Sequence, residues 1–131
     1  MPYYFTFRKG ERVYGLRVEE VEGVARLGEI LPADWAPEWL LGFTFFRGQN
    51  VPVIDLERYL GEPSGEAPYL VVAVTPEGWL GFAASRLGAT YESEEEPAPL
   101  DKPVQGLVGE ILLGGHSVIL LDPLEILRQG G

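Results

Sequence analysis

The sequence predicts an all-β fold made of many short strands. Glycine (17 residues) and proline (11 residues) recur throughout the 131-residue chain, so long uninterrupted stretches are rare. Between these turn formers, apolar and aromatic residues recur mostly at every second position. Both features are typical of strands joined by tight turns and argue against long helices.

The first half of the chain predicts five strands, four of them in two hairpins, because apolar segments flank polar turns at 9–12 and 47–50. The expected strands cover residues 3–7, 13–18, 21–30, 42–46 and 51–54.

The second half predicts five more strands, and Gly114-Gly115 is a favoured hairpin turn. These strands cover residues 69–74, 79–84, 87–91, 107–113 and 118–121. Segment 70–74 has no polar face, so we expect it to be covered on both sides.

Two short helices are expected, one after each set of strands. Asp55 can cap a helix over 56–60, and Asp122 can cap one over 123–128, where Pro123 suits the first helical position. A third short turn is expected at 34–41, before Gly42.

The two halves look like copies of one unit. Residues 48–55 align with 115–122 at an offset of 67, and 14–16 align with 80–82 at an offset of 66. A nearly constant offset implies a duplicated unit of roughly 60 residues. Five strands and a short terminal helix fit a small SH3-like barrel, which closes its own sheet edges.

We therefore expect one domain over residues 1–131 that contains two five-stranded SH3-like barrels with a shared hydrophobic interface. The first barrel and its helix would cover 1–61, and the second barrel with the C-terminal helix would cover 69–129. The strand 70–74 would line the contact between them.

Charge and composition exclude several classes of function. Twenty acidic and ten basic side chains give a net charge of −10, which disfavours nucleic acid and anionic membranes as partners. No apolar run is long enough for a membrane span, and the start lacks a signal-like segment, so we expect a cytoplasmic protein with no membrane insertion. The acidic segment 92–99 is either a solvated loop or a docking loop.

The inventory of reactive side chains is small. The chain has no cysteine and one histidine, His116, which excludes thiolate metal sites, cysteine nucleophiles and cages of several histidines. None of its four serines lies in a G-x-S-x-G motif. We expect no enzyme activity, no cofactor and no metal, and a small hydrolase or ligand-binding barrel is the weakest hypothesis.

Several motifs together resemble the CheW family, the adaptor domain of bacterial chemosensory arrays. They are Tyr14-Gly15-Leu16 followed by Val21, then Pro37, the segment 42–56, and 118–122 with Leu127. Segment 42–56 is similar to the family pattern G-x-x-N-L-R-G-x-x-x-P-x-x-D-L, with Phe45 and Phe46 in place of Asn and Leu. The resemblance spans about residues 3–127.

The resemblance implies two SH3-like barrels and a non-catalytic function. Such domains bind the cytoplasmic tip of methyl-accepting chemoreceptors and the regulatory domain of the histidine kinase CheA, and they let receptors control the kinase. The alternative is a divergent scaffold of the same fold in a twitching, gliding or other two-component signalling assembly.

The resemblance also implies a set of partner-binding residues: Arg47, Val18, Val21, Val24, Phe46, Gly42 and Gly48. Arg47 would offer planar donors to a partner, or else form a surface ion pair with a carboxylate such as Asp55. The valines are either core or partner contacts, and the two glycines are mainly positions that suit an unusual backbone.

The aromatic residues leave two alternatives. Phe43 and Phe45 share one face of their strand, while Thr44 and Phe46 share the other, so one set is core and the other is available to a partner. We favour Phe46 as the contact. Trp35 and Trp39 would cover the core or anchor a partner. We expect His116 to be exposed and Asp55 and Asp122 to be helix caps instead of an acid–base pair.

Overall fold

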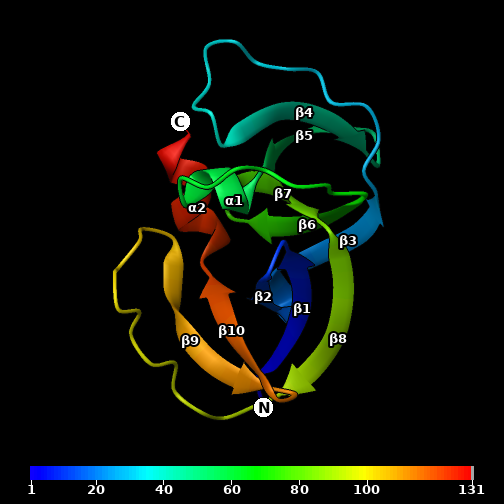
Figure 1. Cartoon of the computed structure of the whole chain (residues 1–131). Helices are drawn as coiled ribbons and strands as arrows, with labels where there is room; N and C mark the ends of the chain where they lie inside the picture. The colour runs from blue at the N-terminus through cyan, green and yellow to red at the C-terminus, as the bar shows by residue number, and fades with distance from the viewer. Residues whose placement is uncertain (131) are drawn as a thin grey trace.

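The computed structural model describes residues 1–130, which form ten strands, two short α-helices and one 3₁₀ turn (Figure 1). Their bounds are β1 (Tyr3–Lys9), β2 (Arg12–Arg17), η1 (Val18–Glu20), β3 (Val21–Arg26), β4 (Leu40–Phe46), β5 (Gln49–Ile54), α1 (Leu56–Tyr59), β6 (Tyr69–Thr75), β7 (Gly78–Ala84), β8 (Arg86–Glu92), β9 (Leu107–Leu113), β10 (His116–Leu121) and α2 (Pro123–Gln129). The predicted all-β fold is confirmed.

The strands form two curled five-stranded sheets. The first has the order β8-β1-β2-β10-β9, and we call it the β1 barrel. The second has the order β3-β6-β7-β5-β4, and we call it the β6 barrel. In Figure 1 the β6 barrel lies above the β1 barrel, with α1 and α2 on one side of the junction.

The predicted duplication is visible in the topology, but the predicted barrel boundaries are wrong. The β1 barrel takes β1 and β2 from the first half of the chain and β8, β9 and β10 from the second half. The β6 barrel takes β6 and β7 from the second half and β3, β4 and β5 from the first half. The barrels therefore do not correspond to residues 1–61 and 69–129. The reason is that strand partners far apart in the chain leave no mark on a local apolar pattern.

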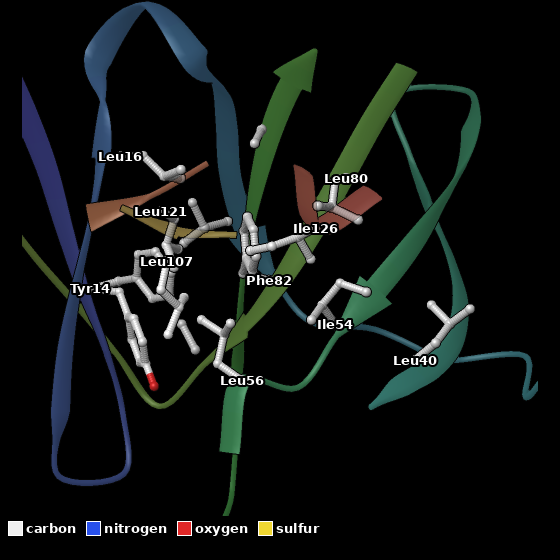
Figure 2. Close-up of a cluster of buried hydrophobic side chains, with 14 residues drawn as sticks. Tyr14, Leu16, Leu40, Ile54, Leu56, Leu80, Phe82, Leu107, Leu121 and Ile126 are labelled. Atoms are coloured by element: carbon white, nitrogen blue, oxygen red, sulfur yellow. The ribbon is translucent and has the colours of Figure 1, made fainter. Parts of the chain in front are cut away.

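The main core lies between the barrels, as predicted (Figure 2). β6 alternates between two apolar environments: Val71 and Ala73 face the shared core, while Leu70 and Val72 face the interior of the β6 barrel. Phe82 lies at the centre of the shared core in Figure 2. Burial of each large side chain there stabilises the fold by about 1.5–3 kcal/mol, so the interface holds the barrels together.

Equivalent glycines occupy the two parallel strand junctions. Gly15 of β2 pairs with Leu120 of β10, and Gly81 of β7 pairs with Val53 of β5. A β-carbon at Gly15 would lie 2.9 Å from a methyl group of Val118, and one at Gly81 would lie 2.7 Å from Leu70. The shared glycine of the repeat therefore provides space for buried side chains at each junction.

The two helix caps are confirmed. The Asp55 carboxylate accepts hydrogen bonds from the N–H groups of Glu57 and Arg58, and the Asp122 carboxylate accepts one from Glu125. The third turn expected at 34–41 is present as two separate hydrogen-bonded turns, closed by Ala36 N–H to Ala33 and by Leu40 N–H to Pro37, and Leu40 already belongs to β4. Neither helix of residues 1–130 is long and apolar enough to cross a membrane.

Candidate partner-binding site

Arg47 closes the β6 barrel at the place where its two outermost strands approach each other. β3 and β4 lie at opposite ends of the sheet order, and Arg47 lies in the turn that follows β4. Its Nη1 donates to the carboxylate of Glu22 on β3 at 3.1 Å and to the Glu22 carbonyl oxygen at 3.3 Å. The carboxylate partner of Arg47 is thus Glu22, whereas the sequence suggested Asp55 as an example.

The backbone of Arg47 is strained. Phe46 pairs with Gln49, so the turn has only two residues, and φ is +47° at Arg47 and +80° at Gly48. Two positive φ values define a type I′ turn, which favours glycine and asparagine. A left-handed conformation costs an arginine roughly 1–2 kcal/mol. The turn is also shorter than the predicted 47–50.

The equivalent turn in the β1 barrel has the same geometry without this strain. Gly114 and Gly115 have φ values of +56° and +80°. Gly114 is the repeat equivalent of Arg47, at the offset of 67 that relates the two hairpins. The fold therefore accepts glycine at this position, and an arginine there has to be explained by its side chain.

Three neighbours hold the Arg47 guanidinium. Its carbon lies 4.9 Å from the centre of the Phe46 ring, within the range of a cation–π contact. A β-carbon at Gly23 would lie 3.0 Å from Nη2, so the bare backbone there leaves room for the guanidinium. With Glu22, these groups hold one side of the guanidinium, while 58% of the side-chain surface stays exposed.

The structure separates the three predicted valines by exposure. Val18 in η1 and Val24 on β3 are 43% and 42% exposed. Val21 is half-buried and packs against the shared core. Val18 and Val24 are available to a partner, whereas Val21 supports β3, which carries Val24 and directly follows η1.

Phe46 is not a surface contact, which corrects our preference. It is 7% exposed and packs against Val51, Val53 and Trp79 inside the β6 barrel. The aromatic side chain that β4 presents to solvent is Phe45, at 71% exposure. The polar Asn50 opposite Phe45 was the sequence signal that could have identified this face.

Gly42 and Gly48 have backbone functions. Gly42 has a φ of +140°, and a β-carbon there would lie 2.1 Å from the carbonyl oxygen of Leu31. That close approach accompanies the bridge in which Leu31 and Phe43 exchange backbone hydrogen bonds. Gly48 faces open space but has a left-handed φ. A side chain at either position would disturb the hairpin that carries Arg47.

The remaining candidates lie elsewhere. Trp39 packs edge-on against Tyr59 and covers the shared core, whereas Trp35 is 75% exposed beside Phe43. His116 is exposed at the start of β10, as predicted. Within residues 1–130, no three His, Cys, Asp or Glu side chains are placed to hold a metal ion.

Comparison with known proteins identifies the family. The model of the CheW-like domain matches residues 3–130. Protein FrzA of Myxococcus xanthus is 39% identical over 95% of this chain and 84% of its own length. The Chemotaxis protein CheW of Thermotoga maritima is 25% identical over 95% of this chain and 86% of its own length.

A solved structure has the same fold. The crystal structure of the scaffolding protein TtCheW from Thermoanaerobacter tengcongensis superposes with a TM-score of 0.80 at 20% identity. The match covers 93% of this chain and 90% of that chain. The fold and the family match together show that this chain belongs to the CheW-like domain family, the scaffold and adaptor domains of chemotaxis signalling.

Proposed function

We propose that this protein is a non-catalytic adaptor that couples methyl-accepting chemoreceptors to a CheA-type histidine kinase by protein–protein binding. Membership of the CheW-like family supports this, as do two relatives named Chemotaxis protein CheW, each 25% identical to this chain. In this proposal the protein acts in the cytoplasm and reaches the membrane through its partners.

The backbone of Arg47 is the observation that carries the proposal. Its φ is +47°, where the sister turn of the fold has Gly114 at +56°. Strained residues of this kind concentrate at functional positions, where the gain from the side chain offsets the strain. The contacts with Phe46, Glu22 and Gly23 then fix the direction in which the remaining N–H donors of Arg47 point.

The proposed contact combines charge and apolar surface. The free N–H groups of Arg47 suit carboxylates or backbone carbonyls at the receptor tip, because guanidinium is a planar donor. Val18 and Val24 add exposed apolar area. Val21, Phe46, Gly42 and Gly48 act indirectly, by holding β3 and the hairpin in place. The signal passes as a shift in how the adaptor positions the receptor against the kinase.

Two substitutions at Arg47 test this proposal. Arg47→Gly should keep or raise the free energy of unfolding by up to about 1 kcal/mol, because it removes the left-handed arginine. The same change should weaken binding to a receptor cytoplasmic fragment by about tenfold or more. Arg47→Glu should also fold and should weaken binding further.

Arg128→Ala is the control, because it removes an exposed ion pair with Glu77 and leaves Arg47, Glu22 and Phe46 unchanged. It should leave receptor affinity unchanged in the same titration. If both Arg47 variants fold and bind the receptor fragment with the affinity of the unmodified protein, Arg47 is not a receptor contact.

A second candidate function is a scaffold of the same fold in a twitching, gliding or other two-component assembly. It is favoured by the 39% identity to a relative that bears the name Protein FrzA and not CheW. Co-purification from the native cell distinguishes the two functions. Recovery of a receptor and kinase of a pilus-linked or gliding pathway would support the second.

A further inference from the structure

The two halves of the chain are joined by strand pairing in both barrels. The N-terminal half (residues 1–60) and the C-terminal half (residues 69–130) flank a hinge segment, residues 61–68. Within a half, the only sheet pairings are the hairpins β1–β2, β4–β5, β6–β7 and β9–β10. All other pairings, namely β1–β8, β2–β10, β3–β6 and β5–β7, join one half to the other.

Neither half can therefore close a barrel with its own strands. An isolated two-stranded hairpin is at best marginally stable in water, so each half depends on the other for its sheet. Each half also exposes unpaired strand edges until the other half covers them. The C-terminal half of a second copy presents the same edges, in the same register, as the C-terminal half of the same chain.

The hinge segment is fastened to the N-terminal half by a buried charge. The Lys9 side chain has no exposed surface, and its Nζ contacts the Glu57 carboxylate, the Gly65 carbonyl oxygen at 3.1 Å and Asp55 at 3.6 Å. Ser64 donates to Asp55, and the Gly65 N–H donates to Glu57 at 2.8 Å. We call these five residues the Lys9 latch.

The latch fixes the path of the chain as it leaves α1. All its contacts with residues 64 and 65 come from the N-terminal half, so they direct the hinge segment toward β6 of the same barrel. A chain that donated its C-terminal half to another molecule would have to release residues 64 and 65 from Lys9, Asp55 and Glu57.

We propose that this protein forms a dimer with a second copy of itself by exchanging halves, and that the Lys9 latch limits this exchange. In the dimer, the N-terminal half of each chain completes both barrels with the C-terminal half of the other. No new side-chain contact is needed, because the barrel interfaces are those of the monomer.

Concentration decides between the two forms. A short linker gives its ends an effective concentration of about 1 mM, so the monomer prevails at micromolar concentration. Loss of the latch frees the hinge segment from the N-terminal half. Removal of residues 62–67 also shortens the segment, so that it spans the two halves of one chain less easily. Both changes favour the dimer.

The register of β1 and β8 gives a specific test, since the chain has no cysteine of its own. Tyr3 of β1 pairs with Glu92 of β8 across the halves, and both are exposed. A tagged Tyr3→Cys copy and an untagged Glu92→Cys copy are unfolded together in urea, refolded and oxidised. A mixed disulfide between them forms efficiently only if β1 of one chain lies beside β8 of the other.

The full-length pair should give at least about tenfold more mixed disulfide when refolded at about 1 mM than at about 10 µM. Lys9→Met in both copies, and separately the removal of residues 62–67, should raise the yield at about 10 µM. One control removes residues 94–96, which join two strands of the same barrel and the same half, and should not raise it. Another pairs Tyr3→Cys with His116→Cys, whose positions are not register partners.

Two pairs of Tyr3→Cys and Glu92→Cys copies are compared at about 1 mM, one with Lys9 intact and one with Lys9→Met in both copies. The proposal is wrong if both pairs fold but neither gives more mixed disulfide than the control pair with His116→Cys. It is also wrong in its second part if exchange occurs but Lys9→Met does not increase it. Lys9→Met leaves the chain length unchanged, so it provides a result even if the shortened hinge does not fold.

Discussion

Tyr14 combines complete burial with an unsatisfied hydroxyl group. Its ring lies 5.8 Å from that of Phe7 in the shared core, but its hydroxyl group has no hydrogen-bond partner among residues 1–130. Burial raises the pKa of Tyr14, so the hydroxyl stays neutral. A buried polar group without a partner costs roughly 1–3 kcal/mol.

Tyr14→Phe should therefore leave stability unchanged or raise it by about 1 kcal/mol. Tyr59→Phe is the matched control, because the Tyr59 hydroxyl donates to the carbonyl oxygen of Gln105 at 2.6 Å. That variant should lose about 1 kcal/mol. Urea unfolding followed by circular dichroism measures both, and a clear loss of stability in Tyr14→Phe would show that its hydroxyl is satisfied in solution.

At the scale of single elements, α1 and α2 occupy equivalent places but have different caps. Asp122 caps α2 and is partly exposed. Asp55 caps α1 and is fully buried. Its carboxylate also accepts a hydrogen bond from the Ser64 hydroxyl and lies 3.6 Å from the Lys9 ammonium. The duplicated cap has thus acquired a second function in the first half of the chain.

This difference predicts unequal costs for the same substitution. Asp122→Ala should lower the free energy of unfolding by about 1 kcal/mol, the usual value for a lost N-cap. Asp55→Ala should lower it by about 3 kcal/mol or more, because it also leaves the buried ammonium of Lys9 with fewer partners. Equal losses in denaturant titrations would show that the Lys9 latch adds nothing to the cap.

Glu57 predicts a pH dependence for the same latch. The hydrogen bond from Lys9, and next the one from the Gly65 N–H, lower the pKa of Glu57 from its usual 4.5. Its contribution to stability is therefore present above pH 4.5 and is lost as the pH falls through the lowered pKa. The unmodified protein should lose stability over that range, and Glu57→Gln should lose less.

Glu77→Gln provides the comparison for this pH series. Arg128 also lowers the pKa of Glu77, but that pair is on the surface, where solvent screens it. We therefore expect Glu77→Gln to change the dependence of Tm on pH between pH 3 and 7 less than Glu57→Gln does. The reverse order would show that the latch is not closed in solution.

Local patterns were sufficient to predict the elements and the duplication. Turn formers and alternation placed the strands of both halves, and Asp55 and Asp122 marked both helix starts. The burial of β4 was not predictable in the same way, because both faces of the strand are apolar around Phe45 and Phe46. Arg47 came from the family resemblance, and its partner Glu22 depends on barrel closure.

At the scale of the whole molecule, each barrel contains strands from both halves of the chain, so neither barrel can unfold alone. All three tryptophans lie in or beside the β6 barrel, and His116 lies in the β1 barrel. Tryptophan fluorescence and the NMR signal of His116 should therefore change at the same denaturant concentration. Two separate transitions would contradict the shared core.

The same topology explains the main failure of prediction from the sequence. A repeat of five strands suggests five strands that close on themselves, and that interpretation places each barrel in one half. The four pairings between the halves, β1 with β8, β2 with β10, β3 with β6 and β5 with β7, show otherwise. Such contacts join residues far apart in the chain, and alternation within a strand says nothing about them.

The position of β10 has a consequence for how the protein is made. β10 follows β3 to β9 in the chain, and it lies between β2 and β9 inside its sheet. The ribosome therefore releases β1 and β2 long before their partners β8 and β10 exist, and this barrel cannot close during translation until β10 has been synthesised. Until then, the nascent N-terminal hairpin is exposed to chaperones and to other nascent chains.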